Sequence, residues 1–185
     1  IDKRVLLKNK MNKLKSERKK KDTKKILENK IKERNELLKS LPELSINIHS
    51  GISPRYKGDA CNFWPFYFFE PNWAGVTFHK LPEKIDDGDI LHQLTPRLEY
   101  DDGLHDVSSK AVLQASLDVL DIINLFNSSK ESNFKKSKNE GRYFRAKDFS
   151  PINLKIIYEF YNDQIVNLFL DKEIKPLEVS LIKLI

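Results

Sequence analysis

The sequence is poor in several residue types that mark well-known structures and sites. It has one cysteine, Cys61, and six glycines among 185 residues. A single cysteine excludes an intrachain disulfide and a zinc site built from cysteines. No glycine-rich motif of the kind that cradles phosphate is present, and no apolar run approaches the roughly 18 to 20 residues of a membrane-spanning helix. We therefore expect a soluble, intracellular protein that binds no cofactor.

Basic side chains are concentrated at the N-terminus. Residues 1–39 contain 16 of the 33 lysines and arginines but 6 of the 27 aspartates and glutamates, so this end carries a net charge of about +10 and the rest of the chain about −4. Apolar residues are absent from 15–25 and recur at helical spacing from 27 to 41. Pro42 then ends the pattern, because proline lacks the backbone donor that a helix needs. The sequence thus predicts a basic helical arm over residues 1–41.

Residues 42–185 are predicted to form a single α+β domain. Strand-like patterns of apolar and aromatic residues occur at 44–49, 62–69 and 73–80, with shorter candidates at 97–100 and 177–185. Apolar faces at helical spacing predict two helices at 107–126 and 151–170, while the polar stretch 127–141 predicts a mobile surface loop. The expected fold is therefore an antiparallel sheet of three to five strands with two packed helices, preceded by the long basic N-terminal helical arm.

The arm has the composition of a polyanion-binding helix. Its charges would neutralise phosphates, and binding would weaken steeply with salt. A second basic patch flanks two aromatic residues that could stack on exposed bases. The residues expected to contact a polyanion are Lys15, Arg18, Lys19, Lys20, Lys21, Lys24 and Lys25 of the arm, and Arg142 and Arg145 of the second patch. RNA is favoured over DNA. For the arm the alternatives are a coiled coil, binding to an anionic membrane surface and a solvated spacer; for the second patch the alternative is an ordinary surface loop.

Apolar residues in two places suggest contacts with another protein. Leucine and isoleucine in the second half of the arm could pack in a coiled coil. If 62–69 is a strand, its aromatic rings point to both faces, so one face meets the core and the other is available to a partner. The partner-binding candidates are Leu27, Ile31 and Leu38 in the arm, and Phe63, Trp64, Phe66 and Trp73 in the body. Core packing alone is the alternative for the aromatic residues.

Carboxylates cluster between residues 86 and 106. Asp101, Asp102 and Asp106, with a histidine nearby, could hold a divalent ion for phosphodiester chemistry, although the spacing does not match an EF-hand. Asp-Gly pairs in this stretch are also common turn residues. Neither Cys61 nor any of the four histidines lies in a recognisable catalytic motif. Turns and an acidic surface are therefore favoured over a metal site.

The favoured interpretation is a non-catalytic subunit of a larger assembly. It would be anchored to RNA or another polyanion through the basic arm, while the body contacts protein subunits. One alternative is a coiled-coil assembly subunit with an α+β head. The other is a metal-dependent nuclease that uses the acidic segment 86–106.

Overall fold

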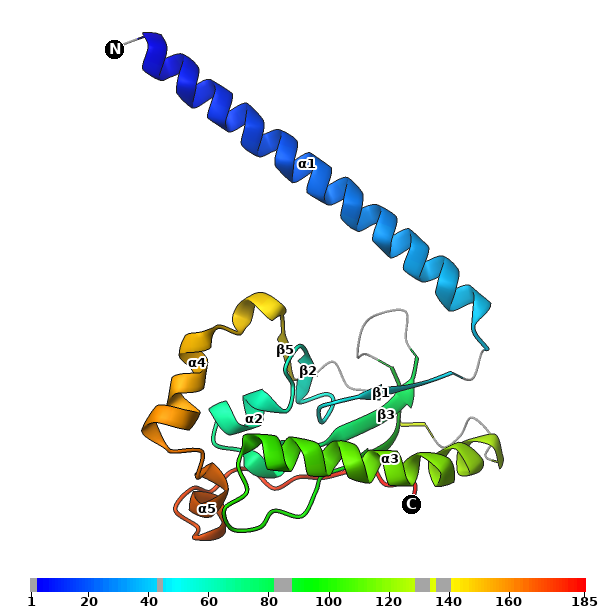
Figure 1. The fold of residues 1–185 in the computed structure, drawn as a ribbon. Coiled ribbons are helices and arrows are strands. Elements are labelled where there is room, and N and C mark those ends of the chain that lie inside the picture. Colours follow the sequence, from blue (N-terminus) through cyan, green and yellow to red (C-terminus); the bar gives the residue numbers. More distant parts are fainter. Residues whose placement is uncertain (1–2, 43–44, 82–87, 129–133, 136–140) are drawn as a thin grey trace. The chain divides into compact units, whose positions relative to one another are not determined.

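The computed structural model describes residues 3–42, 45–81, 88–128, 134–135 and 141–185. They form two compact units, residues 1–43 and 44–185. The first unit is the helix α1 (Lys3–Ser40; Figure 1). Its side chains from 19 to 33 are exposed, and ion pairs such as Lys24 with Glu28 and Lys32 with Glu36 follow its surface at helical spacing.

The second unit is built on a small antiparallel sheet. Its strands are β1 (Ile46–His49), β3 (Val76–Lys80) and β4 (Ile90–Leu94), in the order β1-β3-β4. A separate parallel pair joins β2 (Tyr56–Gly58) to β5 (Arg142–Phe144). The predicted antiparallel sheet is confirmed, although β4 and the parallel pair fall outside the stretches that the sequence pattern marks as strands.

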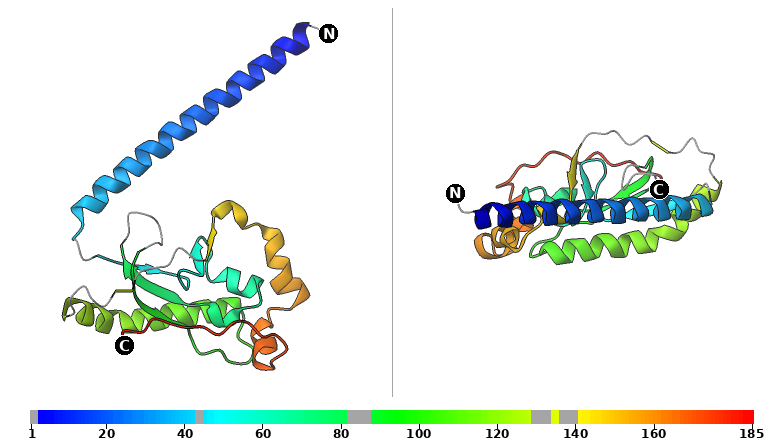
Figure 2. Two further views of the ribbon diagram at one scale, coloured as in Figure 1. Left: turned by 180° about the vertical axis from the view of Figure 1, so that it is seen from behind. Right: turned by 90° about the horizontal axis from the view of Figure 1, so that it is seen from above.

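The helix α3 (Leu104–Ser128) covers one face of the sheet (Figures 1 and 2). It contains the predicted helix 107–126. Its inner side buries small and branched residues against Val76 and Phe78 of β3. Two carboxylates cap its first turn: Gly103 N donates to Asp106 Oδ2 at 2.9 Å, and Leu104 N donates to Asp163 Oδ1 at 2.9 Å.

The predicted strand at 62–69 is wrong. Residues 63–67 form the short helix α2 (Phe63–Tyr67), which is followed by the 3₁₀ turn η1 (Pro71–Trp73). A strand would send neighbouring rings to opposite faces, whereas one helical turn buries Phe63, Trp64 and Phe66 in the same core. Pro65 is tolerated because it lies in the first turn, where its missing donor is not needed.

The predicted helix at 151–170 is interrupted. It consists of α4 (Pro151–Lys155), the π-helical turn η4 (Ile156–Phe160) and α5 (Ile165–Leu170), preceded by the 3₁₀ turn η3 (Ala146–Asp148). Asn162 and Asp163 break it with φ values of 50° and 57°. The break lets Asp163 reach the first turn of α3, while Ile157 and Ile165 on either side remain buried in the core.

The C-terminal residues are not a strand, but they lie along β4 (Figure 2). Gln93 N donates to Ile182 O at 2.7 Å. Most of the predicted loop 127–141 lies outside the described residues, although Lys135 forms an isolated bridge with Ile90 of β4. No helix in the described ranges is both long and apolar enough to cross a membrane.

Candidate functional site

A stripe of polar side chains crosses the face of the sheet opposite α3. Side chains alternate along a strand, so Asn47 and His49 lie on the opposite face from Ile46 and Ile48. The register places Asn47 across from His79 and His49 across from Thr77. Two strands, β1 and β3, therefore bring an amide, two imidazoles and a hydroxyl to one surface, and the third strand, β4, adds Gln93 beside Thr77.

Asn47 and His79 form the centre of this stripe. The distance from Asn47 Nδ2 to His79 Nε2 is 3.1 Å, and His79 Nδ1 lies 3.1 Å from the carbonyl oxygen of Lys80. A carbonyl only accepts, so His79 Nδ1 is the protonated nitrogen and Nε2 accepts from the Asn47 amide. Asn47 is half-buried, whereas His79 is fully buried. The buried ring thus fixes the orientation of a partly exposed amide.

His49 is the second imidazole of the stripe. Its ring centroid lies 6.2 Å from that of His79, and its Nε2 donates to the carbonyl oxygen of Tyr56 at 3.2 Å. The side chain is only 7% exposed. Gly51 allows this close packing, because a Cβ there would lie 2.8 Å from His49 Nε2 and 2.5 Å from the Cβ of Cys61.

The chain also passes close to His79 at Gly88. A Cβ at this position would lie 1.9 Å from the carbonyl oxygen of Lys80 and 2.9 Å from His79 Nδ1. Glycine is therefore required for the approach. Asp86 and Asp87 come directly before Gly88 in the sequence but lie outside the described residues.

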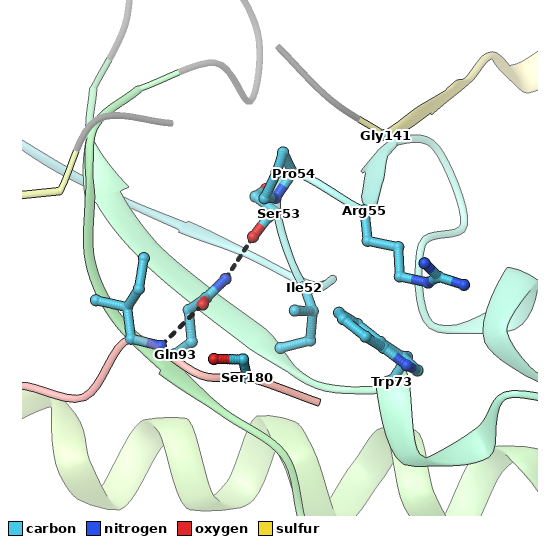
Figure 3. Close-up of a pocket in the computed structure, with 9 residues that line it drawn as sticks. Ile52, Ser53, Pro54, Arg55, Trp73, Gln93, Gly141 and Ser180 are labelled. Carbon is cyan, nitrogen blue, oxygen red and sulfur yellow. Dashed lines mark hydrogen bonds between the residues drawn. The ribbon is translucent and has the colours of Figure 1, made fainter. Parts of the chain in front are cut away.

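The loop that follows β1 is fixed to the sheet by two buried side chains. The Thr77 hydroxyl donates to Gly51 O at 2.6 Å and accepts from Ser53 N at 3.0 Å. Gln93 Nε2 donates to Ser53 O at 2.6 Å, and Gln93 Oε1 accepts from Ile182 N at 3.1 Å (Figure 3). The loop beside His49 is consequently a rigid part of the site.

A pocket of about 250 Å³ lies beside this loop (Figure 3). The Arg55 guanidinium covers one side of it, 4.6 Å above the centre of the Trp73 ring. Glu70 holds Arg55 in place and also accepts from the hydroxyl of Tyr56. Burial alone would raise the pKa of Glu70, but the hydrogen bonds from Arg55 and Tyr56 outweigh it and lower that pKa. Burial and the bond to Glu70 raise the pKa of Tyr56.

The three aspartates proposed as metal ligands have other partners. Both carboxylate oxygens of Asp102 accept from Lys110 Nζ, at 2.8 and 2.9 Å. Asp106 caps α3, and the side chain of Asp101 accepts from Asn167 at 3.1 Å. Within the part of the chain that the structure describes, no group of three or more potential ligands could hold a metal ion. These carboxylates therefore hold turns and helix ends.

The aromatic residues proposed for partner binding lie mainly in the core. Phe63, Trp64 and Phe66 are buried, and the Trp64 ring stacks on Phe144 at 4.3 Å. Trp73 is half-buried at the pocket edge. Such burial leaves the first three rings no surface for a partner.

The remaining residues that were predicted to contact a polyanion or a protein partner lie on α1 and at or beside β5. On α1 the side chains of Lys15, Lys19, Lys20, Lys21, Lys24, Lys25, Leu27 and Ile31 are exposed and Leu38 is half-buried, while the side chain of Arg18 lies outside the description. Arg142 and Arg145 are exposed at β5, and the Arg142 guanidinium lies 4.2 Å from the centre of the Phe68 ring.

Sequence reasoning missed Asn47, His49 and His79. The alternation in 44–49 predicts a strand, but it does not show what the polar side of that strand contacts. Two signals were available. Asn47 and His49 share one side of a strand and are followed directly by a loop rich in turn residues, which is where sites often form. His79 lies in another predicted strand, 73–80, and antiparallel pairing can bring residues of two strands together.

Comparisons with known proteins relate this region to formyl transferases. A family model described as formyl transferase matches residues 34–118, which include β1, β3, β4 and the stripe. The chain is also 36% identical over 63 residues to the bifunctional polymyxin resistance protein ArnA of Wigglesworthia glossinidia brevipalpis. That match covers 34% of this chain and 10% of ArnA.

Solved structures show a related fold. The formyltransferase PseJ from Anoxybacillus kamchatkensis, in complex with UDP-4,6-dideoxy-4-formamido-L-AltNAc and tetrahydrofolate, matches with a TM-score of 0.50 and 22% identity. The match covers 66% of this chain and 63% of PseJ. An N-formyltransferase from Helicobacter canadensis matches with a TM-score of 0.45 and 26% identity, over 57% of this chain and 39% of that one. The family match and the likeness to PseJ indicate that the body has a formyltransferase-like fold.

These findings correct the functional interpretation of the sequence. The sequence favours a non-catalytic subunit anchored to RNA or another polyanion, with a coiled-coil subunit and a metal-dependent nuclease as alternatives. The similarity to formyl transferases points instead to a catalytic protein. The expected partners, RNA or protein subunits, are also wrong, because the similar structure binds a nucleotide-linked sugar and a folate.

Proposed function

We propose that this chain contributes to an enzyme that transfers a formyl group from a formylated tetrahydrofolate to the amino group of a nucleotide-linked sugar. The two ligands of PseJ support both substrate classes, because a formamido sugar and tetrahydrofolate are what remains after such a transfer. Because the chain spans 63% of PseJ and 10% of ArnA, the activity and substrates are inferred for the whole protein.

The reaction requires two kinds of assistance. The amine nitrogen attacks the formyl carbon, and a new C–N bond forms as the carbonyl oxygen becomes negatively charged. The intermediate collapses when the C–N bond to the folate breaks and its electron pair returns to the folate nitrogen. One proton leaves the amine and one is delivered to the folate nitrogen. Hydrogen-bond donors aimed at the oxygen and a group that transfers protons would both accelerate these steps.

The polar stripe supplies groups of both kinds. Asn47 donates one of its two amide hydrogens to His79. The second Nδ2 hydrogen is therefore a candidate donor to the developing oxyanion. His49 is the candidate for proton transfer, because an imidazole ring can both accept and donate a proton. The single observation that carries this assignment is the 3.1 Å contact between Asn47 and His79, inside the residues that match formyl transferases.

The proposal predicts large losses of turnover from small changes at the stripe. In the full-length protein, Asn47→Ala should lower kcat about 10²- to 10³-fold, the usual effect of removing one oxyanion donor. His49→Asn should lower it by about 10²- to 10⁴-fold. Asn124→Ala is the matched control, because Asn124 is exposed on α3, away from the stripe. Folded variants with unchanged turnover would refute the assignment.

We further propose that the helical arm, residues 1–41, and the body, residues 42–185, are separate units. The division into compact units 1–43 and 44–185 supports this boundary, and the match to formyl transferases begins near it, at Arg34. Removing residues 1–33 from the full-length protein should therefore leave formyl transfer intact. Loss of transfer with an unchanged melting temperature would contradict the division.

A further inference from the structure

The pocket beside the loop that follows β1 has the size of a small-molecule site. Its volume is about 250 Å³, whereas a cavity of about 150 Å³ already holds a benzene ring. Figure 3 shows Ile52, Pro54 and Trp73 around it, and Ile182 completes its apolar wall. The pocket therefore has room for one ring with a small substituent.

This pocket lies beside the candidate transfer groups and does not contain them. Among the described residues, its lining includes none of Asn47, His49 and His79. The pocket reaches the polar stripe at β4, where Gln93 lines the wall and donates to Ser53 O at 2.6 Å. A ligand here would therefore not occupy the position of the transferred formyl group.

The wall of the pocket holds hydrogen-bond donors that are not used. A guanidinium has five N–H donors, and Glu70 accepts from Nε and Nη2 of Arg55. The two Nη1 hydrogens of Arg55 have no acceptor in the described part of the chain. The buried hydroxyl of Ser53 likewise has no partner there, although buried polar groups normally have one. Both side chains line the pocket, so both are donors for a ligand.

The acceptors at the same wall are already engaged. Gln93 Oε1 accepts from Ile182 N at 3.1 Å, and the carbonyl oxygen of Arg55 accepts from Arg142 N at 2.9 Å. The carbonyl oxygen of Ser53 accepts from Gln93. A ligand that brings acceptors therefore matches this wall better than a ligand that brings donors.

The charges beside the pocket favour an anion. Arg142 is exposed, directly follows Gly141 of the pocket lining, and acts electrostatically on Glu70. The guanidinium groups of Arg55 and Arg142 thus accompany a single carboxylate, and one positive charge is in excess. Arginine binds carboxylates strongly, because its N–H groups match the spacing of the two carboxylate oxygens.

We propose that the pocket binds a small aromatic monocarboxylate. The ring packs against Ile52, Trp73 and Ile182, where contact with the indole favours a flat ligand. The carboxylate accepts from Arg55 Nη1 and from the Ser53 hydroxyl. A whole nucleotide is too large for this volume, and a neutral ring would leave the excess charge without a counter-ion. The inference rests on volume, donors and charge, so it does not depend on formyl transfer.

Calorimetric titration of the full-length protein with benzoate tests the proposal. We expect a Kd of about 1 mM, which is in the range for a ligand of about nine non-hydrogen atoms. Benzamide has the same shape but no charge, and it should bind at least about tenfold more weakly. Saturating tetrahydrofolate should leave the Kd for benzoate unchanged. Displacement of benzoate by tetrahydrofolate would assign the pocket to the transfer site and overturn the proposal.

A variant that fills the pocket tests where benzoate binds. Ser180 lines the pocket and is exposed, so Ser180→Phe should place a ring there without disturbing the core (Figure 3). Benzoate binding should weaken about tenfold or more, while the melting temperature changes little. Ser109→Phe is the matched control, because Ser109 is exposed on α3, which covers the other face of the sheet. Unchanged binding in Ser180→Phe, or an equal loss in Ser109→Phe, would show that benzoate does not occupy this pocket.

A variant without the ion pair tests the choice of an anion. The double change Arg55→Met and Glu70→Met removes both partners, so no unpaired carboxylate stays buried. This variant should bind benzoate and benzamide with similar affinity. The proposal is wrong if the double variant still prefers benzoate about tenfold. It is equally wrong if the native protein shows no preference for benzoate over benzamide, or no binding of benzoate at about 10 mM.

Discussion

Asn47 and His79 lie 32 residues apart in the sequence, yet their side chains meet at 3.1 Å across two antiparallel strands. The contact joins a half-buried amide to a buried ring whose other nitrogen is fixed by the Lys80 carbonyl. The geometry makes His79 a positioning residue, which acts by orienting the Asn47 amide.

The first prediction tests this positioning role. His79→Phe keeps a ring but removes the acceptor, so the Asn47 amide loses its fixed orientation. We expect kcat for formyl transfer to fall about 10- to 100-fold with little change in KM, because misplacing a catalytic group by about 1 Å has effects of this size. His79→Gln restores an acceptor and should recover part of the loss. Equal activity of the two variants would exclude orientation as the role of His79.

The second prediction concerns pH. Burial and the nearby Lys183 lower the pKa of His92 below its usual 6.5, and His92 Nδ1 accepts from Leu184 N at 3.0 Å. The unfolded chain therefore binds a proton that the folded chain binds less readily. The free energy of unfolding should be fully retained above pH 6.5 and should fall as the pH drops below it.

His92→Asn isolates this contribution. The amide oxygen can replace Nδ1 as an acceptor but does not titrate. Denaturant unfolding at several pH values should show a smaller loss of stability below pH 6.5 in the variant than in the native protein. Identical pH dependence in the two proteins would show that His92 does not cause the effect.

The third prediction compares two ion pairs. Glu70 is 15% exposed and binds both Arg55 and Tyr56, so Glu70→Gln leaves a partly buried guanidinium without its counter-ion. We expect a loss of about 2 to 4 kcal/mol in the free energy of unfolding. Glu99→Gln is the control, because the Glu99 side chain is 56% exposed in its pair with Lys110 and should matter by less than about 1 kcal/mol. Similar losses of stability in Glu70→Gln and Glu99→Gln would show that the difference in burial does not determine how much each ion pair contributes.

The fourth prediction tests the packing next to His49. Gly51→Ala places a methyl group 2.5 Å from the Cβ of Cys61 and 2.8 Å from His49 Nε2, so the loop must shift. Thermal unfolding should show a loss of about 1 to 3 kcal/mol, the usual effect of overpacking. Ser116→Ala on the exposed side of α3 is the control. An unchanged melting temperature in Gly51→Ala would show that the loop can move without strain.

The sequence predicted the regular elements better than the site. The apolar periodicity of α3 and the alternation in β1 follow directly from how those residues are buried. The aromatic run at Phe63–Tyr67 has no clear period, so pattern alone cannot separate a strand from a helical turn. Likewise, Asn162 and Asp163 are residue types that tolerate the left-handed conformation, but their presence in 151–170 does not require a break. The break accompanies the tertiary contact between Asp163 and Leu104.

The site depends on pairing between strands, which a single sequence does not specify. Asn47 and His49 were visible as the polar side of a strand, but that pattern equally fits a solvent-facing surface. Only the register brings His79 to Asn47 and Thr77 to His49. The concentrated charge of residues 1–39 drew the functional interpretation to the arm instead, although the match to formyl transferases lies mostly in the body.

Transfer of an isotopically labelled formyl group tests the central claim most directly. The full-length protein is mixed with tetrahydrofolate that carries the labelled group and with a UDP-linked 4-amino sugar, and the products are analysed by mass spectrometry. The account predicts a labelled formamido sugar and free tetrahydrofolate in equal amounts, with the rate reduced about 10²-fold or more in Asn47→Ala. A folded protein that transfers no label to any nucleotide-linked amino sugar, or equal transfer by Asn47→Ala, would contradict it.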